Sequence, residues 1–275
     1  MSTSIITQGK RLSIMSDFQM SQHENLNQES VNEKSYLDKL VEVITDPVNL
    51  FDYIASRAPK LSDGLGTFSI ALAAISLFFV LAYNVPALKM DLKQQQRTQM
   101  EKQFDKLVAE GKMSATDAET MIDNQLEMMS GPVGMAMAVV GTWVGGFIIF
   151  FISGGLYLLV LKFLLKSAID FKQVMIAMGL PSIITVITMV AAIVLSLLMG
   201  KVIQDVSLAS VLSLDKTSVA GLLGGLVAPF QIWSSVVGAI AISKIGKLEN
   251  PIMAYVLTFG VWFLFVGIGF AFSQM

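Results

Sequence analysis

The chain has 275 residues, of which 54% are hydrophobic and only 15% charged, and its formal net charge is -2. Soluble domains carry about a quarter charged residues, so this balance predicts a membrane protein. A nearly neutral chain has no basic field that would favour nucleic-acid binding. The lack of cysteine and the single histidine, His23, exclude disulfides, thiol catalysis and multi-histidine metal sites.

The N-terminal segment is polar. Residues 1–34 are rich in Ser, Gln, Asn and Glu, so we predict a disordered tail that stays in the cytosol. In residues 35–60, apolar side chains recur at helical spacing, and Asp46-Pro47 is typical of a helix start. We predict amphipathic juxtamembrane helices here, either anchored on the bilayer surface or packed on the protein's own spans.

Five long apolar segments predict an all-α, multi-span membrane protein with five transmembrane helices. The first has no charged residue and would extend roughly 31 Å as a helix, which matches a hydrocarbon core of about 30 Å. The predicted spans within a membrane domain of residues 61–273 are 65–85, 133–161, 181–199, 219–242 and 251–272.

The polar segment 87–132 separates the first two spans and predicts a helical hairpin. Gly111 is placed as a helix stop, and Ser114 with Asp117 resembles a capping box that starts the second arm. The first arm is net basic and the second is acidic. We expect the arms to attract each other on a solvated surface, with docking of a protein partner as the weaker alternative.

Glycine pairs in two spans predict close helix packing. Gly141-x-x-x-Gly145 lies in the second span and Gly221-x-x-x-Gly225 in the fourth. Small residues let helix backbones approach in lipid, so Gly145→Leu or Gly225→Leu is expected to impair assembly.

The break between the second and third apolar segments carries three lysines and Asp170, a predicted helix cap. Residues 171–199 as one helix would extend roughly 43 Å, which is too long for an untilted span. We therefore predict a surface helix over residues 171–178 and a span that begins at Pro181. One continuous kinked helix is the alternative.

Basic residues in the short connections predict the orientation. If the N-terminus is cytosolic, the opposing short connection carries Lys201 and Lys216, and the C-terminal tail has no basic residue. The cytosolic connections then carry Lys162, Lys166, Lys172, Lys244 and Lys247. We predict a cytosolic N-terminus and an external C-terminus, although six basic residues in the hairpin weaken the count.

Loose motifs recur along the whole membrane domain. They are Asp46-Pro47 and Phe51, Gly155-Leu156-Tyr157 and Lys162, Asp170-Phe171-Lys172-Gln173-Val174, Gly179 and Pro181, Phe230 and Trp233, and Lys244 and Lys247. Together they resemble the Yip1 family of membrane proteins in its bacterial form, over roughly residues 40 to 272. The resemblance implies five helical spans and a cytosolic N-terminus, and the expected location is the bacterial inner (cytoplasmic) membrane. The hairpin resembles an insertion in bacterial members. The link of eukaryotic members to Rab GTPases and vesicle traffic is not carried over.

The leading functional hypothesis is a non-enzymatic membrane scaffold or partner-recruiting protein. We expect contact with the lipid bilayer and with protein partners, through the N-terminal region or the hairpin, and a homo-oligomer is a further option. No partner nucleic acid and no cofactor are expected.

The alternative function is a small-solute transporter or channel without intramembrane charges. Permeation pathways usually contain ionisable residues, but none of the five predicted spans contains Asp, Glu, Lys, Arg or His. Uncharged solutes could still use polar side chains, for which interhelical hydrogen bonding is the favoured explanation. These side chains are Thr185, Thr188, Gln231 and Ser234.

A lipid-active enzyme is the least favoured class. The acids near the spans do not form a recognisable catalytic or metal-binding set. They are Asp170, Asp205, Asp215 and Glu249. We predict no catalytic, cofactor-binding or metal site.

Overall fold

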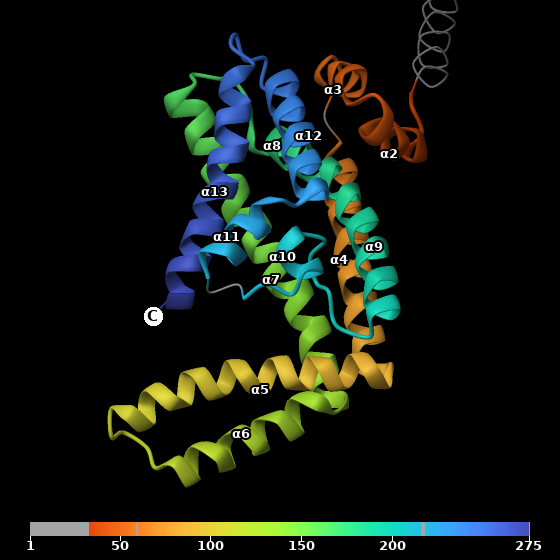
Figure 1. Ribbon diagram of the computed structural model, residues 1–275. Coiled ribbons are helices and arrows are strands. Elements are labelled where there is room, and N and C mark those ends of the chain that lie inside the picture. Colours follow the sequence, from red (N-terminus) through yellow and green to blue (C-terminus); the bar gives the residue numbers. More distant parts are fainter. Residues whose placement is uncertain (1–32, 59, 216–217, 275) are drawn as a thin grey trace, which may run out of the picture. The chain divides into compact units, whose positions relative to one another are not determined.

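The computed structural model describes residues 33–58, 60–215 and 218–274, and it divides into one unit up to Val41 and a second from Glu42 onward (Figure 1). The predicted disordered tail lies almost entirely outside the described residues. In the first unit, helix α2 (Tyr36–Thr45) begins where the Ser35 hydroxyl accepts the backbone N–H of Asp38 at 3.1 Å. The Asp38 carboxylate accepts the backbone N–H of Ser35 in return, at 3.2 Å. This reciprocal cap fixes the start of α2.

The regular structure of the described residues is entirely helical, which confirms the all-α prediction. After α2, the helices are α3 (Pro47–Ala55), α4 (Leu61–Asn84), α5 (Pro86–Ala109), α6 (Ala115–Ser130), α7 (Pro132–Leu159), α8 (Phe171–Gly179), α9 (Ile183–Met199), α10 (Leu208–Val211), α11 (Val219–Leu226), α12 (Pro229–Ile245) and α13 (Ile252–Gln274). A π-helical turn, Val160–Leu164, continues α7, and a 3-10 turn, Leu180–Ser182, joins α8 to α9.

Local sequence signals explain several of these boundaries. Proline occupies the first position of α3, α5, α7 and α12, where its fixed φ suits a helix start and its missing N–H has no consequence. Gly111 has a φ of +70° just after α5, as a helix stop requires. The Ser114 hydroxyl accepts the N–H of Asp117 at 3.1 Å. The predicted end of one hairpin arm and start of the next are therefore confirmed.

Four helical segments are long and apolar enough to cross a membrane on their own: 61–84, 132–164, 171–199 and 252–271. A fifth crossing is formed if α11 and α12 count as one span, and these two helices are bent by 52° at their break. The predicted fourth span is thus a broken helix. Ala228 and Pro229 explain the break, because the proline ring and its missing N–H do not fit a helix interior.

The prediction of a surface helix over residues 171–178 is wrong. Val174, Met175 and Ala177 of α8 are fully buried, and α8 packs against α4, α7 and α12. Residues 171–199 form one helical run through the 3-10 turn, as the alternative prediction had it. Pro181 lies in this turn, so its missing N–H disturbs the run only locally.

Helices α4 and α8 approach each other closely at two glycines. A Cβ at Gly64 would lie 2.5 Å from the Met175 carbonyl oxygen, and one at Gly179 would lie 2.3 Å from the Gly64 oxygen. By contrast, Gly141, Gly145 and Gly225 have nothing within 4 Å of an added Cβ. The prediction that Gly145 and Gly225 mediate packing is therefore wrong for contacts within this chain.

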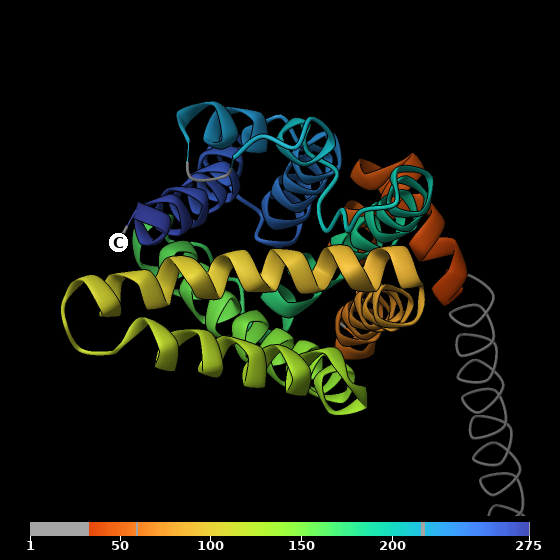
Figure 2. The same ribbon diagram turned by 60° about the horizontal axis from the view of Figure 1, so that its bottom comes forward.

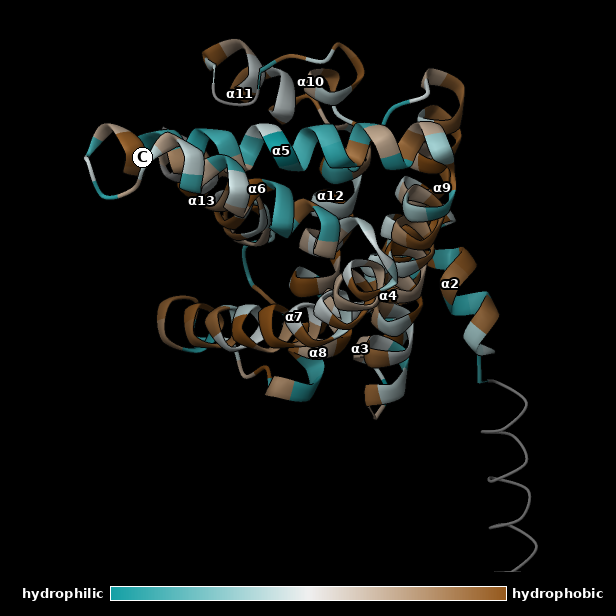
Figure 3. Cartoon of the chain, turned by 90° about the horizontal axis from the view of Figure 1, so that it is seen from below, coloured by the Kyte–Doolittle hydropathy of each residue, from teal (hydrophilic) through white to brown (hydrophobic). Residues whose placement is uncertain are grey.

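Within the second unit, α5 and α6 form the predicted hairpin at the end of the helices opposite α3 and the α12–α13 connection (Figure 1). The hairpin lies across that end of the bundle (Figure 2). Viewed from this side, hydrophilic residues gather on α5 and α6, whereas α7 and α9 are mainly hydrophobic (Figure 3).

Candidate functional site

The base of the hairpin is fixed to the membrane helices by Asp91. Its carboxylate accepts the backbone N–H of Val202 at 2.7 Å, and the Gln95 amide bridges the same carboxylate at 2.7 Å and the Val202 carbonyl at 3.4 Å. An apolar cluster that includes Leu88, Leu92 and Val202 surrounds these bonds. A charged acceptor that is partly shielded from water makes a stronger hydrogen bond than a neutral one. The direction of the hairpin is therefore set at its base.

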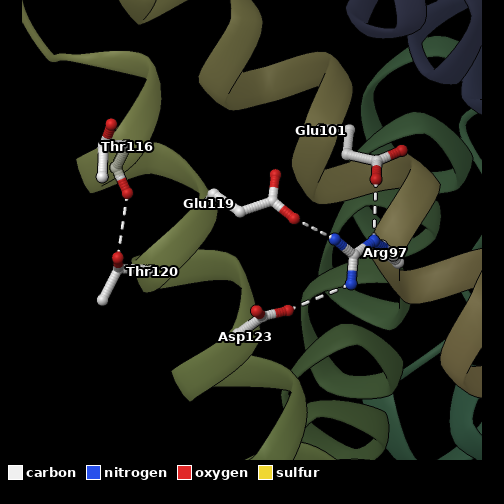
Figure 4. Close-up of polar contacts among 6 residues, drawn as sticks. All are labelled: Arg97, Glu101, Thr116, Glu119, Thr120 and Asp123. Carbon is white, nitrogen blue, oxygen red and sulfur yellow. Dashed lines mark hydrogen bonds and ion pairs between the residues drawn. The ribbon is translucent and has the colours of Figure 1, made fainter.

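The two arms are joined further out by Arg97 (Figure 4). Its guanidinium donates to Glu101 on its own helix at 2.8 Å, to Asp123 on α6 at 3.0 Å, and to Glu119 on α6. The hydrogen bond to Glu101, with the charges of Asp123 and Glu119, raises the pKa of Arg97 above its ordinary value. The arginine stays charged at every physiological pH, and the prediction that the arms attract each other is confirmed.

An apolar seam completes the contact between the arms. Met100 of α5 packs with Ile122 and Leu126 of α6, all three buried. On the opposite side of α6, the Thr120 hydroxyl donates to the carbonyl of Thr116 at 2.9 Å, and both residues point away from Arg97 (Figure 4). We define the outer face of α6 by its exposed residues Thr116, Asp117, Thr120, Asn124 and Glu127. It is a polar, net acidic surface on a positioned arm.

At the other end of the bundle, one lysine of the sequence motifs makes an ion pair. Lys244 of α12 contacts Asp52 of α3 at 2.8 Å, which ties α3 to α12. Ser167 donates to the carbonyl of Gly246 at 2.7 Å and so joins the connection after α7 to the end of α12. Asp170 caps α8 as predicted, since it accepts the N–H of Gln173 at 2.7 Å.

Two cavities lie beside α12 and α13, and together we name them the α12–α13 cleft. The Tyr157 chamber, about 270 Å³, lies between α12, α13, α7 and α8, with polar groups from Ser153, Tyr157 and Ser234. The Asp205 chamber, about 390 Å³, lies between α11, α12, α13 and the connection before α10. Gln231 and Trp262 line both chambers. The sequence singled out Gln231 and Ser234 but did not indicate that they share a cleft.

Three hydroxyl groups of the cleft differ from several others in the apolar helices, and from that of Thr258 in the same chamber, which donates to the carbonyl of Ala254 at 3.0 Å. Ser69, Thr142 and Thr188 each donate to the carbonyl four residues earlier in their own helix, at 2.8 to 2.9 Å. In the part of the chain that the structure describes, the hydroxyls of Ser153, Tyr157 and Ser234 have no hydrogen-bond partner. The interhelical hydrogen bonds predicted for the polar residues do not form at Thr188 or Gln231. Gln231 instead contacts Ser235 of its own helix at 3.4 Å.

The four acids near the spans are not brought together. Asp170 caps α8, whereas Asp205 accepts hydrogen bonds from Ser207 and, at 2.7 Å, from Ser210. Among the described residues, no group of three or more His, Cys, Asp or Glu side chains is arranged to hold a metal ion. Thr185 lies half-buried on α9, away from both chambers.

Sequence reasoning missed two features of these sites. Asp91 was one of many charges in the first hairpin arm, and its partner is 111 residues away in sequence. The unpaired state of Ser153 and Tyr157 depends on the separation of α7 from α13, which periodicity does not reveal.

Comparisons with known proteins identify the family. The Yip1 domain matches residues 41–272, which is most of the chain and includes every helix from α3 to α12. None of the curated proteins and none of the solved structures compared with the chain matches it. The family match agrees with the multi-span helical fold and with the motifs at both ends of α8. The chain therefore belongs to the Yip1 family of membrane proteins.

Proposed function

We propose that this protein is a non-enzymatic membrane scaffold that recruits a soluble protein through the outer face of α6. The single observation that supports this most is the fixed hairpin. Asp91 bonds its base to the connection after α9, and Arg97 joins its arms. An arm held in one orientation loses little entropy when a partner binds.

The charge of this face suggests the chemistry of the partner. Glu119 and Asp123 are already paired with Arg97, whereas Asp117 and Glu127 lie on the outer face. Thr120 and Glu127 are seven residues apart, which places them on one side of the helix. A partner with a basic surface would complement this side and would be steered towards it by charge.

Crosslinking in native membranes tests the recruitment. A photo-crosslinking amino acid at Thr120 should give discrete protein adducts, and Glu127→Lys should abolish them. The matched control places the same crosslinker at Val190, an exposed apolar position of α9. Adducts that persist with Glu127→Lys, or that also form from Val190, would contradict the proposal, as would a lack of any protein adduct from Thr120.

We also propose that α3 and the α12–α13 connection face the cytosol of a bacterial inner membrane, with the hairpin on the opposite side. The lysine distribution supports this orientation. Because the chain has no cysteine, single cysteines report the sidedness directly. Thr120→Cys should react with a membrane-impermeant maleimide in spheroplasts, and Lys247→Cys should react only after permeabilisation. The reverse labelling pattern would overturn the orientation.

The alternative function, small-solute transport without intramembrane charges, is supported by one observation. The two chambers of the α12–α13 cleft follow each other along α13 and meet at Gln231 and Trp262. A flux measurement for this alternative is included in the experiment below.

A further inference from the structure

We propose that the α12–α13 cleft binds an uncharged, lipid-like amphiphile. Its hydroxyl or carbonyl groups would lie in the Tyr157 chamber and its hydrocarbon chain in the Asp205 chamber. This inference goes beyond the scaffold function and does not depend on it, because the cleft and the outer face of α6 share no residue.

Unpaired polar groups define the polar end of this site. The hydroxyls of Ser153, Tyr157 and Ser234 come from two helices and line one chamber, and none has a partner in the described chain. Inside a bilayer, where water is scarce, a hydroxyl without a hydrogen-bond partner is unfavourable. A ligand that donates and accepts hydrogen bonds would satisfy these groups.

The lining also sets the charge of the ligand. Among the described residues, no Asp, Glu, Lys, Arg or His lines the Tyr157 chamber. In the other chamber, the Asp205 carboxylate accepts hydrogen bonds from Ser207 and Ser210. A charged headgroup would be buried there without a counter-charge, which is strongly unfavourable. Trp262 and Phe265 of α13 form much of the remaining wall. An aromatic wall with a few neutral polar groups is typical of sites for neutral amphiphilic molecules.

Glycines shape the chamber that would hold the ligand's hydrocarbon chain. The two chambers span α13 from Thr258 to Phe270, which is about 18 Å at 1.5 Å per residue. Gly225 and Gly269 line the Asp205 chamber, and no described atom lies within 4 Å of a Cβ added at either position. Their missing side chains widen the chamber beside the break between α11 and α12.

Access from the bilayer follows from the packing of α13. Its main packing partner in the described chain is α12, and α7 is not among its close neighbours. Phe265, which lines the Tyr157 chamber, is 51% exposed, so the chamber reaches the lipid-facing surface. A molecule already dissolved in the bilayer can enter from the side without crossing a charged surface.

A photoactivatable monoacylglycerol tests the site. The purified full chain in phosphatidylcholine nanodiscs should be labelled saturably on residues 219–245 and 252–274, in competition with unlabelled monoacylglycerol but not with hexadecane. Tyr157→Phe and Ser234→Ala should each weaken binding about five-fold, as expected for one hydrogen bond. Thr188→Val is the matched control, because its hydroxyl is satisfied within α9, and it should leave labelling unchanged.

Gly225→Leu tests whether ligand binding can be blocked without a loss of protein stability. The leucine should fill the Asp205 chamber and reduce saturable labelling at least ten-fold, while the unfolding temperature stays unchanged because the site is open. Labelling that does not saturate, or that is equal in wild type, Tyr157→Phe and Gly225→Leu, would overturn the proposal. If wild-type protein conducts glycerol or urea into liposomes and Gly225→Leu abolishes this flux, the cleft is a pathway for small solutes and not a site for an amphiphile. Neither outcome alters the crosslinks expected from Thr120.

Discussion

The two sides of α12 are packed in opposite ways. On one side, α8 is inserted between α4, α7 and α12, and the side chains of Val174, Met175 and Ala177 are fully buried. On the other side, α13 meets α12 at Ala254 and Thr258, which are the buried positions among its described side chains. The first side has helix backbones in contact and the second has two chambers. One helix thus separates a rigid half from an open half.

The glycines show the physical basis of this difference. Gly64 and Gly179 permit backbone contact between α4 and α8, although neither belongs to a GxxxG pair. Gly225 belongs to such a pair and instead lines a chamber. In lipid, a small residue serves packing only where a second helix approaches it. Spacing within one helix therefore does not determine which role a glycine has.

The largest expected effect is at the glycine contact of the rigid half. Gly64→Leu should lower the free energy of unfolding by at least about 3 kcal/mol, because its side chain would overlap the α8 backbone at Met175 and Ile176. Gly64→Ala should also lower the free energy of unfolding, but by less than Gly64→Leu. Thermal unfolding of purified protein in detergent measures both.

Gly145→Leu is the matched control for Gly64→Leu. It faces open space, so its stability should remain within about 1 kcal/mol of wild type, with helix propensity favouring leucine. Equal losses at Gly64 and Gly145 would show that Gly145 packs against a second copy of the chain. Close glycine packing would then not be confined to the rigid half of a single chain.

How far the sequence predicts this fold follows from the same residues. Apolar length, proline at helix starts and the Ser114 and Asp170 caps are local signals, so the helices, the hairpin and the membrane class were predictable. The burial of α8 was not, because Lys172 and the length of residues 171–199 suggested a surface segment. Its burial depends on Gly64, more than 100 residues earlier in the chain. The chambers were equally hidden, since they depend on how far α13 stands from α7.

A second, smaller effect is expected at the base of the hairpin. Asp91→Ala removes the acceptor of the buried Val202 N–H, which should lower stability by about 1–3 kcal/mol. Asp91→Asn keeps a carbonyl acceptor and should lose less. Spin-label distances between the outer face of α6 and α4 should broaden in Asp91→Ala alone. Unchanged distances would show that the apolar cluster at Leu88 and Leu92 is sufficient to hold the hairpin.

In the connection between α12 and α13, one substitution should raise the free energy of unfolding instead of lowering it. Lys247, two residues after the end of α12, has a φ of +47°, in the left-handed region that favours glycine. Lys247→Gly should therefore raise stability by about 0.5–1 kcal/mol. Lys247→Ala removes the charge but keeps the strain, so it should show no gain. A gain of equal size in both variants would assign the effect to charge rather than to the backbone.

The smallest effect is expected where α3 meets the rigid half. The ion pair between Asp52 and Lys244 is 2.8 Å long, but both side chains are more than a third exposed. Water and salt screen such pairs, so Asp52→Asn should lower the free energy of unfolding by no more than about 0.5 kcal/mol, and less at 1 M salt than at 0.05 M. Leu50 and Phe51, both fully buried, hold α3 in place by packing. A loss above about 2 kcal/mol that persists at high salt would mean that the rigid half depends on charge as well as on close backbone contact.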